Sequence, residues 1–381
     1  MRLIGSAAVS VILGFSIAAS VTCSKKPDSW KGRIIIEDGI KVAHNTKDPL
    51  SSPAAITFTS ELTIGQESDR QDAVIFRNLM PYGCVDTDAS GSIYILDSGA
   101  DTVFKLDPQG RLQKSFGRQG QGPGEFQSPG CIKVMPGGEI AVVDDIARKL
   151  VQFSQDGTFL KEERLASFPE SGMVSLDSQG GIVTVSITES GDRLAMSLIR
   201  ILPGQKRIVK YAEAETRRVY DGTTLDLYIP QFRLAVSGGD AIVWGFQREY
   251  VLNVSDLSGK VLRRIKKDYD PTPITETAFQ TRLKEAFGGR AVPQNITPVH
   301  PPSYWPFSLL IADEKGRILA RIPNEPADGK MKYDVFDEEG RFAASVELNG
   351  FPVLWKDGRL FVLEESPEAG QFLRCMRVRW N

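Results

Sequence analysis

The chain has 381 residues, of which 41% are hydrophobic, so it can bury a sizeable core. Its 46 basic and 48 acidic residues are interspersed and give a formal net charge of −2. This balance creates no long-range field that would attract nucleic acid or an anionic surface, and we expect no nucleic-acid partner.

The first 22 residues have the pattern of an export signal. Arg2 precedes an apolar stretch that runs from Leu3 to Val21. A basic start followed by a short hydrophobic core is typical of a signal peptide that is removed on export. We therefore predict a signal peptide over residues 1–22 and a mature protein outside the cytoplasm.

Cys23 ends the run Ser20-Val21-Thr22-Cys23, which resembles the lipobox of bacterial lipoproteins. The resemblance implies that Cys23 is acylated and tethers the protein to a membrane without spanning it. Thr22 departs from the small residue usual there, and ordinary cleavage after Ser20 is the alternative. We expect a bacterial periplasmic or outer-membrane-anchored lipoprotein whose only membrane contact is this lipid. Residues 23–53 are then a linker and an N-terminal arm.

The most regular feature of the chain is a repeat of 47 residues. Its second copy places Cys131, Asp144 and Gly157 where the first has Cys84, Asp97 and Gly110. Each copy consists of short alternating runs separated by turn glycines, which predicts four short antiparallel strands. Such a unit, repeated at a fixed period, is typical of a β-propeller blade.

The turn glycines extend this register over the rest of the chain. First-hairpin glycines are Gly91, Gly138, Gly181, Gly239, Gly316 and Gly358. Because glycine tolerates positive φ at hairpin tips, they predict six blades in one all-β domain over residues 54–381. The last unit has only three strands, and the run over residues 55–62 supplies the fourth, which closes the ring. The expected blades lie near 81–117, 129–166, 170–212, 232–268 and 304–347, with the sixth built from 350–380 plus 54–65.

Two connections between blades are longer than the repeat requires, at residues 213–231 and 269–303. In the second, Phe279, Leu283 and Phe287 are spaced by four and two glycines follow, which predicts a short helix between blades 4 and 5. Both insertions are expected at one mouth of the central channel. They either contribute to function or pack onto neighbouring blades.

The glycine-rich run from Phe116 to Phe126 resembles the linker between NHL repeats, and the strands over 93–97 and 140–144 resemble the strand-plus-aspartate of that repeat. The wider layout, with Trp30-Lys31-Gly32 near the start, resembles bacterial six-bladed β-propeller lipoproteins. This resemblance implies an exported propeller that binds a ligand or a protein partner. It supplies no catalytic motif.

Asp97 and Asp144 are the first candidate site residues, because both end a second strand at the expected mouth. Carboxylates converging there could hold calcium, as in a gluconolactonase- or paraoxonase-like propeller. Alternatively, each caps its own following turn through backbone N–H groups. Recurrence at equivalent positions favours this structural role.

His300, Tyr304 and Trp305 are the second group of candidates, at the end of the longer insertion. They could form a stacking surface for a sugar or a peptide at the mouth. The alternatives are an incidental surface histidine and two aromatic residues that begin the first strand of blade 5 and belong to the core.

With Cys23 acylated, Cys84, Cys131 and Cys375 remain. A bridge between Cys84 and Cys131 is conceivable in an oxidising compartment. Burial as small apolar side chains in the inner strands is the favoured interpretation.

These observations predict a monomeric, non-catalytic binding module that recognises a protein or a glycan at the channel mouth, without a cofactor. The alternative is a metal-dependent hydrolase or lyase, and calcium enters only there. A purely structural component of the cell envelope is the third possibility.

Overall fold

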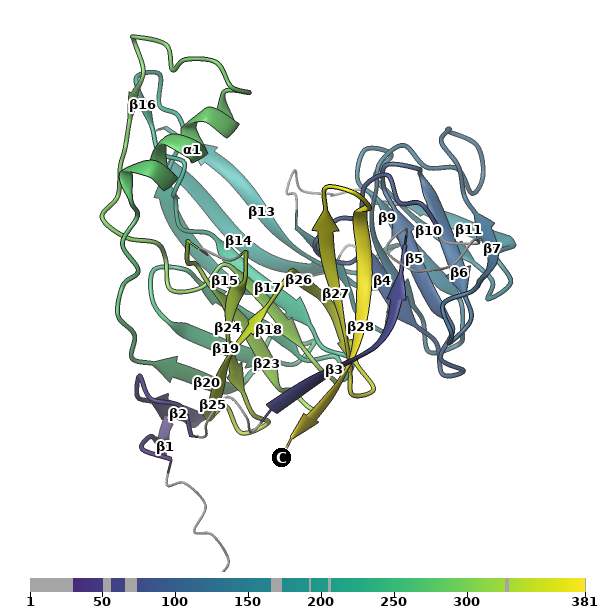
Figure 1. Cartoon of the computed structure of the whole chain (residues 1–381), viewed down its shortest axis with the longest axis horizontal. Coiled ribbons are helices and arrows are strands. Elements are labelled where there is room, and N and C mark those ends of the chain that lie inside the picture. Colours follow the sequence, from purple (N-terminus) through teal and green to yellow (C-terminus); the bar gives the residue numbers. More distant parts are fainter. Residues whose placement is uncertain are drawn as a thin grey trace, which may run out of the picture.

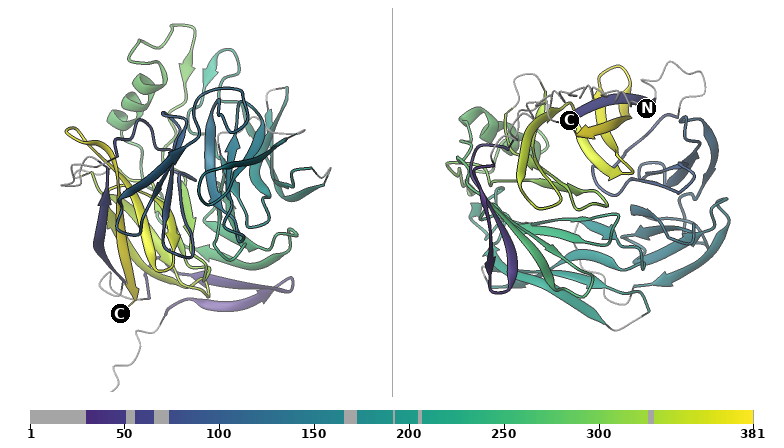
Figure 2. Two further views of the ribbon diagram at one scale, coloured as in Figure 1. Left: turned by 90° about the vertical axis from the view of Figure 1, so that its right-hand side faces the viewer. Right: turned by 90° about the horizontal axis from the view of Figure 1, so that it is seen from below.

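The computed structural model describes residues 30–50, 56–65, 74–165, 173–191, 193–204, 207–325 and 329–380. The signal peptide over 1–22 and the lipidation site Cys23 lie outside these residues. Six sheets surround a central channel and form a six-bladed β-propeller, as predicted (Figures 1 and 2). None of the helical structure in the described ranges is long and apolar enough to span a membrane.

The strands follow the predicted register along the chain. Blade 1 contains β4 (Val85–Thr87), β5 (Ile93–Asp97), β6 (Thr102–Leu106) and β7 (Leu112–Phe116). Blade 2 contains β8 (Pro129–Val134), β9 (Ile140–Asp144), β10 (Lys149–Phe153) and β11 (Phe159–Arg164). Blade 3 contains β12 (Val174–Leu176), β13 (Ile182–Ser190), β14 (Arg193–Ile201) and β15 (Ile208–Arg217).

The second half of the ring continues the pattern. Blade 4 contains β17 (Phe232–Val236), β18 (Ile242–Phe246), β19 (Val251–Ser255) and β20 (Val261–Lys267). Blade 5 contains β22 (Leu309–Ala312), β23 (Ile318–Ile322), β24 (Met331–Phe336) and β25 (Phe342–Leu348). Blade 6 contains β26 (Phe351–Lys356), β27 (Arg359–Ser366), β28 (Gly370–Trp380) and β3 (Ile56–Ile64).

In blades 1 and 2 the second strands are buried on both faces because each of these blades packs between two neighbours. Every residue of β5 and β9 is buried, whereas most of β7 is exposed. In these two blades the second strands are therefore almost entirely apolar, and the outer strands carry most of the polar residues.

The first-hairpin turns lie where the glycines predicted them, except that in two blades the residue with positive φ is displaced by one position. Gly91 and Gly138 have φ of 84° and 92°, as expected for left-handed turn positions. In blade 3 this position is Gly180 rather than Gly181, and in blade 4 it is Asp240 rather than Gly239. Asp tolerates the left-handed region better than most residues, so the turn survives without glycine.

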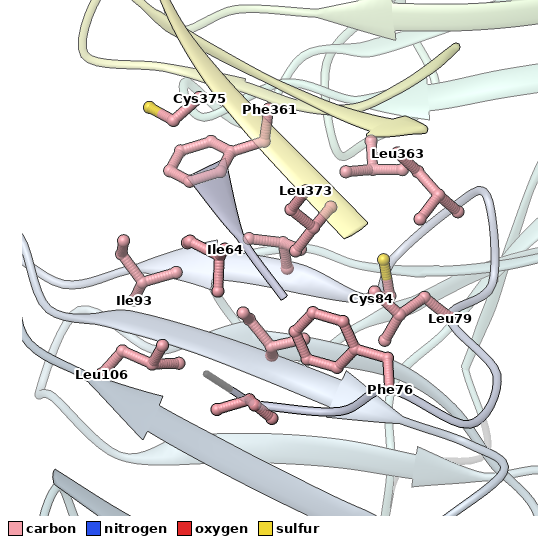
Figure 3. Close-up of a cluster of buried hydrophobic side chains, with 14 residues drawn as sticks. Ile64, Phe76, Leu79, Cys84, Ile93, Leu106, Phe361, Leu363, Leu373 and Cys375 are labelled. Carbon is pink, nitrogen blue, oxygen red and sulfur yellow. The ribbon is translucent and has the colours of Figure 1, made fainter. Parts of the chain in front are cut away.

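The N-terminal strand closes the ring as predicted. β3 pairs antiparallel with β28, from Ile64 opposite Leu373 to Ile56 opposite Trp380. Behind this pairing, side chains of blade 6 and blade 1 share one buried cluster that includes Ile64, Leu373 and Ile93 (Figure 3). Apolar packing thus joins the two ends of the chain.

The N-terminal arm differs from the expectation of a linker outside the propeller. β1 (Arg33–Glu37) and β2 (Ile40–Asn45) form a hairpin, and β2 pairs in parallel with β20. Blade 4 therefore has six strands rather than four (Figure 1). A single hairpin without a second copy leaves no period in the sequence, which is why the repeat did not indicate it.

The glycine-rich linker between blades 1 and 2 is a hydrogen-bonded loop. The Phe126 N–H donates to the Arg118 carbonyl at 2.8 Å, and the Gly120 N–H donates to the Phe126 carbonyl at 2.9 Å. A Cβ at Gly117 would lie 2.4 Å from the buried Phe126 ring, so only glycine fits there. The loop holds Phe126 in the core between the two blades.

The two insertions fold together into a small subdomain. β16 (Thr224–Leu225) from the first pairs in parallel with β21 (Thr297–Pro298) from the second, and the predicted helix is α1 (Glu276–Ala286). α1 buries Phe279 and Leu283 against Leu225 and Ile274. The helix thus packs mainly on residues of the two insertions, and the subdomain stands at one end of the molecule in Figure 1.

Cys84, Cys131 and Cys375 are free and buried, as the favoured interpretation predicted. Burial raises the pKa of the Cys84 thiol to about 12 and that of Cys375 to about 11. Such thiols act as small apolar side chains.

Candidate functional site

Asp97 is fully buried, and its carboxylate accepts hydrogen bonds from four backbone N–H groups. Two of them, Gly99 and Ala100, belong to the turn that follows β5, and the other two belong to the incoming segment at Arg77 and Asn78. Asp144 is also fully buried, and it accepts from Gln127, Ser128 and Ala147. These contacts match the capping alternative, and a ligand contact for either residue stays a prediction.

His300 lies against α1. Its ring stacks on Phe279 with centroids 4.2 Å apart and an interplanar angle of 6°. Nδ1 is 3.4 Å from the Glu276 carboxylate, and Nε2 is 3.2 Å from the Ile274 carbonyl. The imidazole therefore belongs to the packing of the insertion subdomain.

Tyr304 and Trp305 precede β22 rather than begin it, because the strand starts at Leu309. The Trp305 indole N–H donates to the Tyr228 carbonyl, and the Tyr304 hydroxyl is 3.4 Å from Glu325. Burial, with the Glu325 charge beside it, raises the pKa of Tyr304 to about 12. Both aromatic side chains are fixed at the wall of a cavity.

The central channel is narrow and is lined by the first strand of every blade. Its free volume is about 100 Å³. Deep in it, the buried Asp86 carboxylate accepts from Lys356 Nζ at 2.8 Å, and Lys133 Nζ lies 3.7 Å away. A ligand larger than a few atoms does not fit into the channel and must therefore bind at the mouth.

Two cavities lie at the mouth. The inner cavity, of about 460 Å³, is lined largely by apolar residues, namely Pro81, Tyr82, Met173, Val185, Ile187, Met196, Phe232, Leu309 and Phe351. The outer cavity, of about 730 Å³, lies between the blades and the insertion subdomain and is lined by Tyr228, Tyr304 and Trp305 among others. Both have the size of ordinary small-ligand sites.

The two cavities meet at Gln231, Arg233, Ser308 and Arg321, which line both. Arg233 is on β17 of blade 4, and Arg321 is on β23 of blade 5. Burial lowers the pKa of both guanidinium groups from the ordinary value of 12.5. They stay protonated at neutral pH, so the mouth is cationic where the cavities join.

The repeat contains a signal for both arginines, which are not among the site residues predicted above. Arg233 takes the inner-strand position held by Cys84, Cys131, Met173 and Leu309 in other blades. Arg321 takes the second-strand position held by Leu96, Val143 and Val185. A charged residue at an otherwise apolar repeat position indicates a local function rather than a requirement of the fold.

No three His, Cys, Asp or Glu residues in the described ranges gather closely enough to hold a metal ion. The mouth thus offers shape, aromatic surface and positive charge. This chemistry suits recognition of a ligand by contact and hydrogen bonding.

Comparisons with known proteins agree with the fold. A family model described as a 6-bladed beta-propeller matches residues 86–183. The crystal structure of a presumed exported protein from Bacteroides fragilis is similar over 89% of this chain and 99% of that chain, with 12% sequence identity and a TM-score of 0.56.

Two further solved structures are more distant. A member of the duf4221 family from Bacteroides vulgatus has 11% identity and a TM-score of 0.49, over 86% of this chain and 99% of that chain. A gluconolactonase from Xanthomonas campestris has 13% identity and a TM-score of 0.42, over 84% and 98%. No curated protein matches this chain. At these identities the likeness concerns the fold alone.

Proposed function

We propose that this propeller is an exported binding module that recognises a protein or glycan ligand at the channel mouth. The observation that carries the proposal is the pair of cavities, about 460 and 730 Å³, that meet at four polar side chains. A largely apolar concavity with a few convergent polar groups is the usual form of a ligand site.

The walls of the site support binding because they are rigid. The inner cavity rests on strands of the blades, and hydrogen bonds hold Tyr304 and Trp305 at the outer cavity. Aromatic side chains with fixed orientation bind sugars and apolar side chains at a low cost in conformational entropy.

Binding without catalysis is the function that these residues support best. A calcium-dependent hydrolase or lyase would need several free carboxylates facing one point. Asp97 and Asp144 instead direct their carboxylates at backbone N–H groups, and arginines line the mouth. We therefore infer neither a metal nor another cofactor.

Export, lipidation of Cys23 and a propeller domain over residues 54–381, to which the hairpin β1–β2 adds two strands of blade 4, complete the proposal. The outer edges of propeller blades are short and protected, which supports a monomer. Mass spectrometry of the membrane-extracted protein tests the anchor. Acylation at Cys23 is expected, and an unmodified chain that starts after Ser20 would contradict it.

Thermal unfolding tests the function. The purified protein is heated with calcium, magnesium or EDTA, and then with a panel of peptides and of neutral and acidic oligosaccharides. A ligand at one hundred times its dissociation constant adds about 2.7 kcal/mol to the stability of the native state, so binding raises the midpoint. We expect at least one panel member to do so, and Trp305→Ala to abolish the rise while the control Trp30→Ala retains it. A rise with calcium alone would support the hydrolase instead.

A further inference from the structure

Two arginines at the mouth lack an acidic partner. Most buried or half-buried arginines of this protein pair with a carboxylate, as Arg317 does with Asp313 and Arg200 with Asp177. Within the described ranges, neither Arg233 nor Arg321 forms an ion pair. Arg233 Nη1 donates to Gln231 Oε1 at 3.0 Å, and Arg321 lies 5.0 Å from the centre of the Phe351 ring.

These groups also have hydrogen-bonding capacity to spare. The Nε atoms of Arg233 and Arg321 and the Ser308 hydroxyl are buried and have no partner among the described residues. A buried charge without a counter-charge destabilises a fold, and unpaired buried polar atoms are rare. An arrangement that costs stability at a cavity is explained if a ligand completes it.

The lining of the inner cavity indicates the sign and shape of that ligand. Its described residues include two arginines and no aspartate or glutamate. A guanidinium presents a planar fork of N–H donors that matches the two oxygens of a carboxylate. Around the arginines lie Met173, Met196 and Phe232, which offer an apolar surface.

We propose that the inner cavity binds the carboxylate of a ligand between Arg233 and Arg321, with an apolar group of the same ligand against Phe232 and the methionines. This inference rests on the proposed function and specifies its ligand. Ser308 and Gln231 complete the set of donors around the carboxylate. The apolar lining favours an apolar acid over an acidic sugar, whose hydroxyl groups would need polar partners.

Such a carboxylate belongs either to the C-terminus of a peptide or to a small organic acid. The outer cavity contains Arg282, Glu285 and Glu325 besides its aromatic residues, so its charges are mixed. It has room for the residues that precede a C-terminal carboxylate. Affinity that grows with peptide length would identify a peptide, in agreement with the proposed function. Affinity that is complete in the single acid would identify a small molecule and would replace the protein or glycan ligand of that function.

Calorimetric titration of the purified protein tests the proposal. The probes are N-acetyl-phenylalanine, its amide, the peptide acetyl-Gly-Gly-Phe with a free C-terminus, and an oligogalacturonate. A charge-assisted hydrogen bond contributes about 1.5–3 kcal/mol, which corresponds to about a 10- to 150-fold change in affinity. We therefore expect the acids to bind at least tenfold more tightly than the amide. Arg233→Met and Arg321→Met should each weaken the acids by the same factor.

Arg263→Met is the matched control. Arg263 also has a buried Nε without a partner, but it lines neither mouth cavity. Its substitution should leave binding unchanged. Arg233→Lys keeps the positive charge but loses the planar set of N–H donors, so this variant should bind the acids less tightly than the wild type. Circular dichroism checks that each variant is folded.

Equal affinity for the acid and its amide would overturn the proposal. Oligogalacturonate binding through the arginines, without binding of the apolar acids, would also overturn it in favour of an acidic glycan. Both results leave the proposed function standing if another panel ligand binds and Trp305→Ala abolishes that binding. If no ligand of the panel binds at the mouth, the proposed function itself fails.

Discussion

At the scale of single residues, we expect Arg233 and Arg321 to contribute to ligand binding and not to the stability of the fold. Arg233 and Arg321 are half-buried, and replacing each by an apolar side chain of similar size removes the cost of desolvating a charge that has no counter-charge. We expect Arg233→Met and Arg321→Met to raise the midpoint of thermal unfolding without ligand. Arg317→Met should lower the free energy of unfolding by about 3 kcal/mol, because it leaves the fully buried Asp313 without its counter-charge. Lower midpoints for both mouth variants would show that these arginines stabilise the fold.

Asp97 tests the structural role of the repeated aspartates. Asp97→Asn puts an amide where four backbone N–H groups converge, and we expect a loss of about 2–4 kcal/mol in the free energy of unfolding. Asp156→Asn, at an exposed turn, is the control and should change little. Urea denaturation measures both. An Asp97→Asn protein of normal stability that no longer binds ligand would assign Asp97 to the site.

Asp145 gives the fold a dependence on pH. Burial, together with the neighbouring Asp144 charge, raises the pKa of Asp145 to about 6 from an ordinary value of 3.8. Between these values the folded state binds more protons than the unfolded state, so the free energy of unfolding falls as pH rises through this window. The stabilisation that the protonated Asp145 side chain contributes is fully present below pH 3.8 and is lost above about pH 6.

Asp145→Asn should remove this slope and be more stable than the wild type at pH 7. Thermal unfolding of both proteins from pH 4 to 7 measures the difference. Parallel curves for the two proteins would contradict the raised pKa.

The roles of some single residues could be predicted from the sequence and those of others could not, for a physical reason. The roles of Asp97 and Asp144 could be weighed because the repeat shows both in the same place. Arg233 and Arg321 were overlooked because each occurs once. Only comparison with the apolar residues at the same register, such as Met173 and Leu96, makes them visible.

At the scale of elements, Asn45 attaches the hairpin β1–β2 to the ring. Its amide donates to the Lys266 and Gly340 carbonyls at 3.2 and 3.0 Å and accepts from the Phe342 N–H at 2.7 Å. It therefore joins the hairpin to blades 4 and 5. We expect Asn45→Ala to reduce the free energy of unfolding by about 2–4 kcal/mol, since these buried groups lose their partner.

Hydrogen exchange provides the second readout for this variant. Faster exchange in β1 and β2 is expected, and Asn295→Ala, at an exposed turn, serves as the control. Unchanged exchange and stability would show that strand pairing alone holds the hairpin.

Elements that belong to the repeat were predictable, and those outside it were not. Turn glycines placed the strands of all six blades within a few residues, and the spacing of Phe279 and Leu283 located α1. The hairpin β1–β2 and the pairing of β16 with β21 depend on contacts between distant segments, such as Lys41 with Arg263 and Thr224 with Thr297. A local sequence pattern does not indicate contacts between segments so far apart in the chain.

At the scale of the whole molecule, β3 determines whether the ring is closed. A chain that starts at residue 66 lacks β1, β2 and β3, exposes the edge of β28 and loses Ile56 and Ile64 from two buried clusters. We expect it to unfold without a cooperative transition or to aggregate. A chain that starts at residue 51 lacks only the hairpin and should still unfold cooperatively at a lower midpoint. Cooperative unfolding of the chain that starts at residue 66 would contradict the role of β3 in closing the ring.

The most direct test of recognition at the mouth is the methyl NMR spectrum of the protein labelled with ¹³C at its methionines. Met173 and Met196 line the inner cavity, whereas Met135, Met331 and Met376 lie elsewhere in the blades. Titration with any ligand that raises the unfolding midpoint should shift the signals of Met173 and Met196 and leave those of Met135, Met331 and Met376 in place. Met80 precedes Pro81 of the inner cavity and is not used in this comparison. Shifts confined to Met135, Met331 or Met376 would place the ligand away from the mouth and contradict the account.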